Sequence, residues 1–382
     1  MYGCWQVLGG NYVVRLSNKI DAVINASGRM TKLGVSTQSD GVKEAMQYGA
    51  SHYYLIDDLY ESAGEEIAKM LDVEAVVVTS SASAGISLAV AGLICKDDDY
   101  LKVRLPRLKE TIAKREVVIM KGQNVDFGVP IETMIELGGG KVVEAGWANG
   151  TSEVDMAGCI NENTLALMYV KSSHCVQKNM LSFEKMVEIA KKHNIPLIAD
   201  VAAEVDFQIF YEQGADIVIY SGAKTLLGPT SGFVECKSKV TATYIRKQLY
   251  GIGRGMKIGK ENIFGLVEAI YEYKNDITKM NVTYADLEEF IKHVNEIKGL
   301  SAVKCKDESG REIYRAKITF DKNEYGYSAL EMEKRLAKEE PAIYTRSYEA
   351  NLGHLHFDPR PLNSIQELNT ILETLQNGGK ND

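Results

Sequence analysis

Seven short apolar runs, spread over residues 75–235, constrain the fold of this sequence more than any other feature. Segments with helical spacing of apolar residues lie between several of them, such as the one that carries Ile86, Ala89 and Leu93. Continuous apolar strands that alternate with amphipathic helices are typical of a mostly parallel sheet with helices on both faces. The sequence therefore predicts an α/β fold with the strands Ala75–Val78, Glu116–Met120, Lys141–Val143, Leu165–Val170, Ile195–Ala199, Ile217–Tyr220 and Gly232–Glu235.

The sixth run leads into a loop that carries a lysine. Ile217–Tyr220 is followed by Ser221 and Gly222, then by Lys224, and a glycine-proline break at Gly228 closes the stretch. Ligands of parallel α/β sheets collect at the carboxyl ends of the strands, so this lysine has two interpretations. It is either a solvated loop charge, the commoner case for lysine, or a lysine that forms a Schiff base with pyridoxal phosphate (PLP). In the second case, the Ser221 hydroxyl lies near the phosphate.

Two other strand ends carry residues that a PLP site needs. After the first run, residues 79–85 read Thr-Ser-Ser-Ala-Ser-Ala-Gly and enter a segment with helical spacing. Free amides and small side chains at a helix start favour an anion, although such residues also serve as simple helix caps. After the fifth run, Asp200 ends a buried strand, where a carboxylate is costly unless a cation or donor meets it. This residue is either a helix cap or the acid that keeps a pyridine nitrogen protonated.

The order of small-residue loop, strand-end aspartate and strand-end lysine resembles that of fold-type I PLP enzymes. The sequence is more closely similar to the family of bacterial selenocysteine synthase (seryl-tRNA selenium transferase), and within it to the branch of D-glucosaminate-6-phosphate ammonia-lyase. The resemblance spans nearly the whole chain and implies the seven-stranded sheet plus a smaller C-terminal α/β domain. It is carried in combination by INASGRMTKLG, VVVTSSASAGISLAV, NENTLALMYVKSS, PLIADVAAE, IVIYSGAKTLLGPTSG and the segment Arg254–Leu266.

The resemblance also implies roles in a cofactor site. It makes Lys224 the residue that binds PLP covalently and Asp200 the partner of the pyridine nitrogen. Ser173, after the fourth run, would lie near the cofactor's hydroxyl group, and Gln123 or Asn124, after the second run, over its ring. The implied phosphate ligands are Ser81, Ala82, Ser83 and Ser221.

Cationic residues in two further stretches are candidates for binding the substrate. The glycine-rich stretch GIGRGMKIGKEN is either a solvated turn or a site for a substrate phosphate, and in the family resembled it lies near the active site at the dimer interface. Later in the chain, two arginines flank a strand-like alternation. Each is either a surface residue or the small-domain arginine that holds a substrate carboxylate in fold-type I enzymes. The predicted substrate-binding residues are Arg254, Lys257, Lys260, Arg346 and Arg360.

Composition and residue patterns exclude several other classes of protein. With 382 residues, the chain is long enough for a large and a small domain, which we expect at residues 1–265 and 266–382. A net charge of -8 argues against a nucleic-acid surface. The six cysteines include no C-x-x-C pair, which argues against a disulfide framework or a zinc site. His354 and His356 share one strand face, but no third ligand has recognisable spacing, so we predict no metal.

Location and assembly are also predicted. No apolar run is long enough to cross a bilayer, and Met1–Gly10 lacks the layout of a signal peptide. We therefore expect a cytoplasmic protein without a membrane partner. Because fold-type I active sites lie at a subunit interface, the resemblance implies a homodimer or a dimer-based oligomer.

For function, the resemblance implies a PLP-dependent ammonia-lyase. Its small-molecule substrate would be a phosphorylated amino-sugar acid, D-glucosaminate 6-phosphate, and its products 2-keto-3-deoxygluconate 6-phosphate and ammonia. A selenocysteine synthase acting on seryl-tRNA is an alternative, but that enzyme carries an extra domain before the core motif, which here begins at Ile24. Another PLP lyase or aldolase acting on a small amino acid is a further alternative. Ser221 and Lys224 also have the spacing of a penicillin-recognising hydrolase, yet the S-D-N and K-T-G elements are missing.

Overall fold

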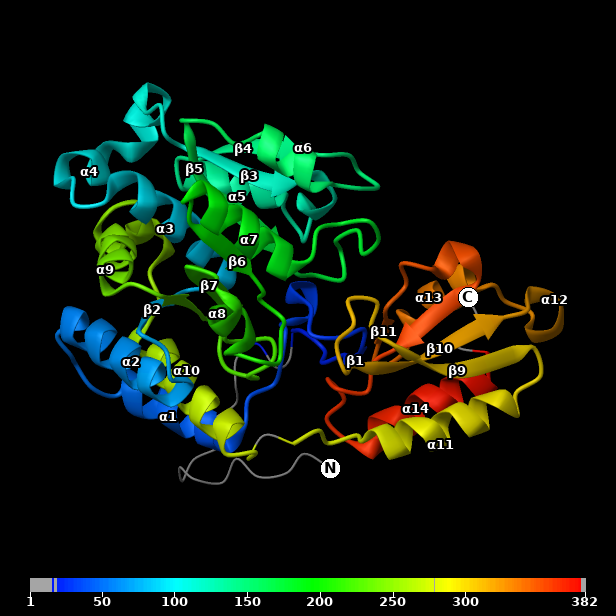
Figure 1. Ribbon diagram of the computed structural model, residues 1–382. Helices are drawn as coiled ribbons and strands as arrows, with labels where there is room; N and C mark the ends of the chain where they lie inside the picture. Colours follow the sequence, from blue (N-terminus) through cyan, green and yellow to red (C-terminus); the bar gives the residue numbers. More distant parts are fainter. Residues whose placement is uncertain (1–15, 17–18, 278, 379–382) are drawn as a thin grey trace. The chain divides into compact units, whose positions relative to one another are not determined.

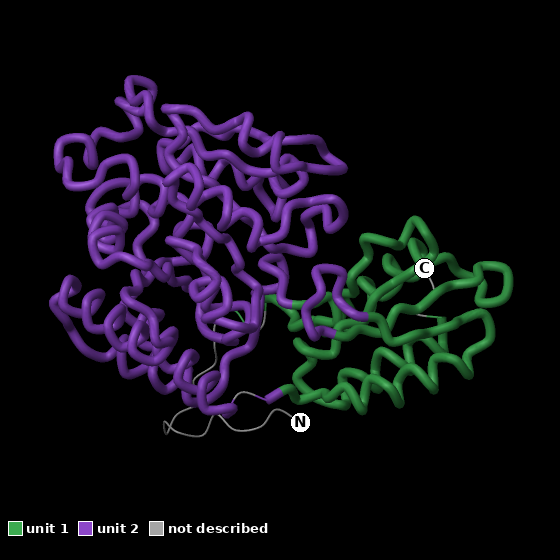
Figure 2. Tube along the Cα trace, in the orientation of Figure 1, with its two compact units in different colours: residues 1–28, 280–305, 314–382 green, residues 29–279, 306–313 purple. Residues whose placement is uncertain are grey.

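The computed structural model describes residues 16, 19–277 and 279–378 of the chain, so that Met1–Gly10, with Cys4, lies outside the described residues. The chain forms two compact units, which Figure 2 distinguishes by colour. The larger unit contains Arg29–Lys279 and Lys306–Ile313. The smaller unit contains the described residues up to Gly28, Met280–Cys305, and the described residues from Tyr314 onward. Within the described ranges, no helix is long and apolar enough to cross a membrane.

The larger unit is built on the seven-stranded sheet that the apolar runs predict (Figure 1). The strand order is β2-β8-β7-β6-β5-β3-β4. Neighbours from β7 to β4 are parallel, whereas β8 is antiparallel to both β2 and β7. Each predicted run forms one strand, with the bounds Ala75–Thr79 (β2), Glu116–Met120 (β3), Lys141–Ala145 (β4), Thr164–Val170 (β5), Leu197–Asp200 (β6), Ile217–Ser221 (β7) and Gly232–Cys236 (β8). The predicted mostly parallel sheet is therefore confirmed.

Helices connect and cover these strands, as the amphipathic segments predict. The α-helices of the larger unit are Asp40–Ala50 (α1), Ile56–Leu71 (α2), Ala82–Cys95 (α3), Asp99–Leu108 (α4), Ile131–Leu137 (α5), Glu153–Gly158 (α6), Phe183–His193 (α7), Ile209–Gln213 (α8), Lys239–Lys247 (α9) and Lys260–Lys274 (α10). Short 3-10 helices are Thr31–Leu33 (η1), Lys109–Thr111 (η2), Lys121–Gln123 (η3), Gln248–Tyr250 (η4) and Ile252–Met256 (η5).

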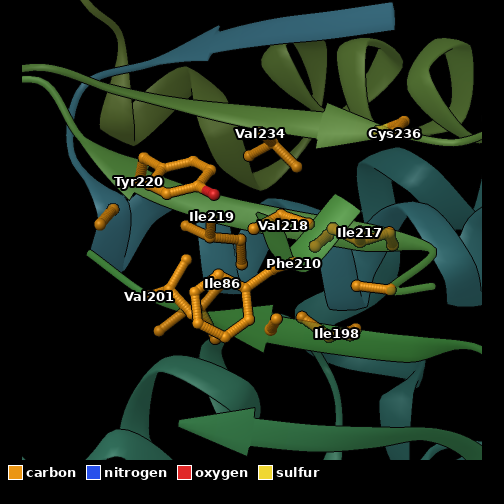
Figure 3. Close-up of a cluster of buried hydrophobic side chains, with 14 of the residues drawn as sticks. Ile86, Ile198, Val201, Phe210, Ile217, Val218, Ile219, Tyr220, Val234 and Cys236 are labelled. Atoms are coloured by element: carbon orange, nitrogen blue, oxygen red, sulfur yellow. The ribbon is translucent and has the colours of Figure 1, made fainter. Parts of the chain in front are cut away.

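The core of the larger unit fixes α3 against the middle of the sheet. Figure 3 shows Ile86 of α3 in the same cluster of buried side chains as Ile219 of β7 and Val234 of β8. Gly85 permits this close approach, because an added Cβ would lie 2.9 Å from Cγ2 of Ile219 and 3.1 Å from Cγ2 of Val234. Residues 79–85, which the sequence predicts to bind an anion, form the predicted anion loop at the start of α3. The packing of α3 therefore holds this loop beside the end of β7.

The smaller unit is an α/β structure with its own core. Its three-stranded sheet has the order β12-β10-β9, and a separate parallel pair joins β1 to β11. The core contains Phe290, Phe357 and Ile371, contributed by two helices and one strand. The elements are Ile24–Ala26 (β1), Tyr284–Asn295 (α11), Leu300–Lys306 (β9), Tyr314–Phe320 (β10), Lys322–Tyr325 (α12), Ala329–Leu336 (α13), Ile343–Thr345 (β11), Ala350–Leu352 (η6), His354–Phe357 (β12) and Ile365–Gln376 (α14).

The compact units divide the chain differently from the predicted domains 1–265 and 266–382. The predicted boundary falls inside α10, whose Leu266 and Ile270 are buried in the core of the larger unit. At the other end, pairing of β1 with β11 attaches Ile24–Ala26 to the smaller unit. The turn Lys306–Ile313, between β9 and β10, is in turn part of the larger unit. Local sequence patterns do not reveal these contacts, because each joins segments that are distant in the chain.

Glu235, on β8, is a carboxyl group inside the core of the larger unit. The residue is 0% exposed, and among the described residues neither of its side-chain oxygens has a hydrogen-bond partner. Burial raises the pKa of Glu235 well above its ordinary value, and the charge of Asp206 raises it further. The folded chain therefore holds Glu235 protonated at a pH where the unfolded chain ionises it.

We expect Glu235→Gln to stabilise the folded chain, with a gain that grows with pH. From about pH 4.3 upward, an unfolded glutamate ionises while the folded one stays protonated. The free energy of unfolding of the wild type therefore falls by about 1.4 kcal/mol per pH unit until the folded-state pKa is reached. Glutamine does not ionise, so the free energy of unfolding of the variant does not fall in this way as the pH rises. Urea unfolding of both proteins at pH 5 and pH 7 measures the difference, and an equal gain at both pH values would contradict the expectation.

Candidate active site

The carboxyl ends of β5, β6 and β7 bring Asp200 and Lys224 into one site. The strand register pairs Val170 with Asp200, and Asp200 with Ile219. At the last residue of β7, the backbone nitrogen of Ser221 donates to the carbonyl oxygen of Ala202, in the loop after β6, at 3.2 Å. The two loops therefore stay adjacent, and the charges of Asp200 and Lys224 act on each other.

Burial shifts the pKa values of this pair in opposite directions. It raises the pKa of Asp200 to about 6, against the opposing charge of Lys224. It lowers the pKa of Lys224 against the charge of Asp200, and Arg311 lowers that pKa further. Among the described residues, Oδ1 of Asp200 is buried without a hydrogen-bond partner. The site thus holds an amine biased toward its neutral, nucleophilic form, and a carboxyl oxygen available to a donor from a ligand.

The predicted anion loop lies at the neighbouring strand ends. Pairing of β2, β8 and β7 places Thr79 and Ser221 on either side of Gly232. Ser81 caps α3, because its hydroxyl accepts at 3.0 Å from the backbone nitrogen three residues later. A Cβ on Gly232 would lie 2.6 Å from the nitrogen of Ala82, so glycine is needed for this approach. The helix start, with its free amides and favourable dipole, is suited to a phosphate, and the residues placed around it are Ser81, Ala82, Ser83 and Ser221.

Two residues of the N-terminal segment hold the backbone on both sides of Lys224. The Ser36 hydroxyl donates to the carbonyl oxygen of the preceding residue at 2.8 Å, and Nη1 of Arg29 donates to that of the following residue at 3.2 Å. The Thr225 hydroxyl donates to the carbonyl oxygen of Ala203 at 3.2 Å. Sequence reasoning missed Arg29 and Ser36, because their partners are 196 and 187 residues away.

A group of four charges, three of them on buried residues, lies beside the loop that follows β6. Glu204, which is 6% exposed, has Lys171 Nζ at 3.3 Å and Arg311 Nε at 3.8 Å from its carboxylate. Arg311 also donates to Asp307 at 3.1 Å and 3.2 Å, and to the carbonyl oxygen of Ala203 at 3.3 Å. Burial raises the pKa of Glu204, against the charges of Lys171 and Arg311. No sequence motif marks this cluster, because the turn that carries Arg311 joins it from a distant part of the chain.

The side chain of Gln123, from η3, contacts the end of β5, and Ser173 follows that strand. Oε1 of Gln123 accepts from the backbone nitrogen of Val170 at 2.8 Å, and the residue is 4% exposed. Asn124 donates to Glu144 at 2.8 Å. Ser173 lies in the loop directly after β5. The contacts that the resemblance implies for Gln123 and Ser173 with the cofactor stay predictions.

The cations of the glycine-rich stretch have different surroundings. Arg254 and Lys257 are exposed, on η5 and just after it. Lys260 instead donates to the carbonyl oxygens of Gly49 and Ala50, at 2.9 Å and 2.8 Å, and also to that of His52. These three contacts use all three donors of the ammonium group to cap α1. The roles of the three cations in substrate binding stay predictions, and among the described residues no hydrogen bond joins any of them to Asp200 or Lys224.

Arg346 and Arg360 lie in the smaller unit, close to a buried carboxylate. Asp358 is 0% exposed and accepts from Nε and Nη2 of Arg360 at 2.9 Å and 2.7 Å, and from Nε of Arg315 at 3.0 Å. Burial raises the pKa of Asp358, but the two arginines more than offset this effect and hold it below its ordinary value. The guanidinium of Arg346 lies over the ring of Tyr348, 4.9 Å from its centre.

The two histidines of β12 have separate partners. Nδ1 of His354 lies 3.0 Å from the hydroxyl of Thr319, and Nε2 of His356 lies 2.9 Å from the carboxylate of Glu349. Within the described part of the chain, no group of three or more His, Cys, Asp or Glu side chains could hold a metal ion.

The fold and the strand-end site define the class of protein to which the chain belongs. A mostly parallel sheet with an aspartate, a lysine and a helix start at neighbouring strand ends is the arrangement of fold-type I PLP enzymes. Solved structures agree at the level of the fold. An alanine aminotransferase from Pyrococcus furiosus superposes with a TM-score of 0.53 at 15% identity, over 95% of this chain and 94% of that one.

Sequence comparison identifies the family within this class. The model of the family "SelA: L-seryl-tRNA selenium transferase" matches residues 23–299. D-glucosaminate-6-phosphate ammonia lyase of Salmonella typhimurium is 42% identical over 88% of this chain and 90% of its own length. A solved structure of D-glucosaminate-6-phosphate ammonia-lyase superposes with a TM-score of 0.87 at 39% identity, covering 97% and 98% of the two chains. The chain belongs to the L-seryl-tRNA selenium transferase family.

Other relatives show how the family varies. The 5'-C-glycyluridine monooxygenase-decarboxylase of a Streptomyces species is 36% identical over 91% of this chain and 88% of its own length. An L-seryl-tRNA(Sec) selenium transferase of Clostridium botulinum is 27% identical over 65% of this chain and 56% of its own length. The comparisons confirm the predicted resemblance and fold class, and they identify the chain as an enzyme of the lyase type.

Membership of the family implies PLP as the cofactor, and the residues of the site fit it. The buried Oδ1 of Asp200 accepts no hydrogen bond from the described residues, as expected for an atom that would accept one from a protonated pyridine nitrogen. Gly232 lets the start of α3 approach the end of β7 closely, and a phosphate would lie at this helix start. The neighbouring amine of Lys224 has the lowered pKa that Schiff-base formation requires.

Proposed function

We propose that the chain is a PLP-dependent ammonia-lyase that acts on a phosphorylated amino-sugar acid. Its substrate is D-glucosaminate 6-phosphate, and its products are 2-keto-3-deoxygluconate 6-phosphate and ammonia. The observation that carries the proposal is the proximity of Asp200 and Lys224 at the strand ends, in a chain 42% identical to D-glucosaminate-6-phosphate ammonia lyase. We infer a cytoplasmic enzyme.

In this proposal each strand end contributes one part of the cofactor site. Lys224 binds PLP covalently, and Asp200 holds the pyridine nitrogen. Gln123 and Ser173 complete the site near the ring and its hydroxyl group. The bound cofactor supplies an electron sink for the negative charge that develops on the substrate's Cα. The phosphate is held by Ser81, Ala82, Ser83 and Ser221.

Lys224 moves the proton in the proposed reaction. Displaced by the substrate amine, its own amine accepts the proton from Cα, and burial favours the neutral form that this step requires. Ser36 and Arg29 hold the backbone on both sides of Lys224, which limits the positions that the amine can take. The proton taken from Cα and the hydroxyl group on Cβ would leave as water, and addition of water at Cα would then release ammonia and leave the keto group.

One of the two arginines of the smaller unit would bind the substrate carboxylate. Arg360 already presents two donors to the buried Asp358. Arg346 lies over the Tyr348 ring and also forms a hydrogen bond with this tyrosine. Both arginines are therefore proposed as candidates for the carboxylate ligand.

The glycine-rich stretch GIGRGMKIGKEN would act between subunits of a homodimer or dimer-based oligomer. Arg254 and Lys257 are exposed in the single chain, where a partner's substrate could reach them. The described surface also exposes large apolar side chains, including Tyr53 at 100% and Leu55 at 75%, which a partner subunit would cover. We therefore infer that Arg254 and Lys257, rather than Lys260, bind the substrate phosphate.

Incubating the PLP-loaded enzyme with D-glucosaminate 6-phosphate tests the proposed function. We expect equal amounts of 2-keto acid and ammonia, with much less product from unphosphorylated D-glucosaminate. Seryl-tRNA serves as the competing substrate. Consumption of seryl-tRNA without turnover of the amino-sugar acid would overturn the proposal, and so would the absence of any 2-keto acid.

We expect Arg254→Ala to raise the apparent KM for the phosphorylated substrate about tenfold or more. Loss of a charge-assisted hydrogen bond costs about 1.5–3 kcal/mol, and 1.4 kcal/mol corresponds to a factor of ten. The KM for an unphosphorylated analogue should barely change. Initial rates over a range of concentrations of both substrates measure the two effects.

Lys260→Met provides the matched control for this prediction. Because Lys260 caps α1 rather than facing solvent, its loss should lower the thermal unfolding temperature and leave the preference for the phosphorylated substrate unchanged. Equal KM increases for both substrates in Arg254→Ala would show that the loop supports structure rather than recognition.

A further inference from the structure

A cysteine, a histidine and a glutamate meet on the polar face of the three-stranded sheet in the smaller unit. Cys305 is on β9 and His356 is on β12, so the two residues flank the central strand β10. Their side chains meet across it, with Sγ of Cys305 3.6 Å from Nδ1 of His356. The opposite face of the sheet carries core residues such as Ile318 and Leu355. The proposed lyase reaction uses neither Cys305 nor His356.

Glu349 fixes which nitrogen of His356 carries the proton. The carboxylate of Glu349 accepts from Lys317 Nζ at 2.7 Å and lies 2.9 Å from Nε2 of His356. Hydrogen bonding to Lys317, opposed by burial, lowers the pKa of Glu349, so this group is an ionised acceptor. Nε2 must then be the donor, which leaves Nδ1 as the acceptor for the thiol proton of Cys305.

Burial keeps the imidazole neutral and ready to act as a base. His356 is 4% exposed, and its burial lowers its pKa in spite of the contact with Glu349. The ring of Tyr348 stacks on it, with centroids 5.1 Å apart. A nucleophile, a base at hydrogen-bond distance, and a third group that orients the base form the arrangement that activates catalytic cysteines and serines.

We propose that Cys305 is a site of reversible S-thiolation by low-molecular-mass disulfides, with His356 as its base and Glu349 as the group that orients the base. The Cys305 thiol passes its proton to Nδ1 of His356 as its sulfur attacks one sulfur of the disulfide. A new S–S bond forms and the old one breaks. The departing thiolate takes the proton back from His356, so atoms, charge and oxidation state balance.

The surroundings of Cys305 favour attack assisted by a base over attack by a preformed thiolate. Burial raises the pKa of the thiol, while Arg315 and Lys317 lower it, and the net direction is upward. Little thiolate exists at neutral pH, so removal of the proton during the attack matters. The same cations favour a negatively charged disulfide such as glutathione disulfide. Cys305 is half-buried, and Val303, two residues earlier on the strand, is 58% exposed.

The chain provides a matched control for the reactivity of Cys305. Cys159 is also half-buried, but its sulfur lies 3.8 Å from a backbone carbonyl oxygen instead of an imidazole. Cys95, Cys175 and Cys236 are buried. A Cys4→Ser background removes the thiol that lies outside the described residues.

The experiment exposes the full-length holoenzyme to glutathione disulfide at pH 7.5 and follows each cysteine-containing peptide by mass spectrometry. We expect Cys305 to form the mixed disulfide at least about tenfold faster than Cys159. His356→Asn should lower the rate of mixed-disulfide formation at Cys305 about tenfold or more, and Glu349→Gln should lower it by less. Neither substitution should change the rate at Cys159. Labelling of buried Cys236 would reveal a variant that has unfolded.

The pH dependence of the wild-type rate decides the question even where a variant fails to fold. With His356 as base, the rate at Cys305 should level off below the pKa of the thiol and fall only as the imidazole is protonated. At Cys159 it should rise about tenfold per pH unit with the thiolate fraction. The groups facing the pair are Glu349, Lys317, Arg315, Arg346 and Tyr348. Equal rates at the two cysteines, or parallel pH profiles, would overturn the proposal.

Discussion

Lys224→Gln is expected to lower 2-keto acid release by a factor of about 10⁴ while the chain remains folded. Loss of a general base alone costs about 10²–10⁴-fold, and here the residue also forms the covalent link to the cofactor. Glutamine is close to lysine in size and carries no charge, so it avoids the cost of burying an ammonium group. Steady-state release of 2-keto acid and ammonia measures the loss.

Two controls separate chemistry from binding in this variant. Borohydride should fix PLP to the wild-type peptide that contains Lys224 and should fix none to Lys224→Gln, although the variant still binds the cofactor. A small primary amine added to the solution should restore part of the proton transfer, because it can occupy the space that the side chain leaves. Activity within tenfold of wild type, or a covalent label on another lysine, would contradict the assignment of Lys224.

The sheet could be predicted from the sequence because most of its strands are buried on both faces. Apolar residues then run continuously, as in Ile217–Tyr220, and each such run became one strand. A chain of this kind also concentrates its polar residues at the strand ends. Asp200 and Lys224 were therefore predictable as a pair, since parallel strands next to each other end at the same edge of the sheet.

The residues that sequence reasoning missed act through contacts between distant segments. Ser36 and Arg29 hold the backbone around Lys224 from almost two hundred residues away, and their partners are carbonyl oxygens, which every residue possesses. Arg311 reaches Ala203 from the turn between β9 and β10. A local pattern cannot specify such a contact, because the donor has no characteristic spacing from an acceptor of this kind.

Because local sequence patterns do not specify contacts between distant segments, they also do not reveal the different surroundings of the cations in the glycine-rich stretch. Arg254 and Lys260 are equally cationic and only six positions apart, and composition alone gives them the same role. The carbonyl oxygens at the end of α1 capture Lys260, because α1 and α10 pack together and bring the end of one helix beside the start of the other. Packing, rather than charge, separates a structural cation from one that faces solvent.

Asp200→Asn is expected to slow exchange of the substrate's Cα proton by a factor of about 10³, as for loss of a positioned electrostatic partner. The amide keeps the size of the side chain but loses the negative charge that stabilises a protonated pyridine nitrogen, so the cofactor becomes a weaker electron sink. Some PLP should remain bound through Lys224 and the phosphate loop. Exchange followed by NMR in deuterated water measures this step apart from the later release of ammonia.

The pKa of Asp200 supplies a second and independent measurement of its role. Burial raises that pKa to about 6 in the protein without cofactor, so Asp200 becomes protonated as the pH falls through this value. Protonated Asp200 must release its proton before it can pair with a pyridinium nitrogen, and the affinity for PLP should therefore weaken below about pH 6. The PLP phosphate titrates in the same range and affects the PLP affinity of both proteins equally. Only the wild type has, in addition, the pH dependence that comes from the Asp200 carboxyl group. We expect the wild type to lose more affinity than Asp200→Asn between pH 7 and pH 5, and parallel curves would show that Asp200 caps its loop without contacting the cofactor.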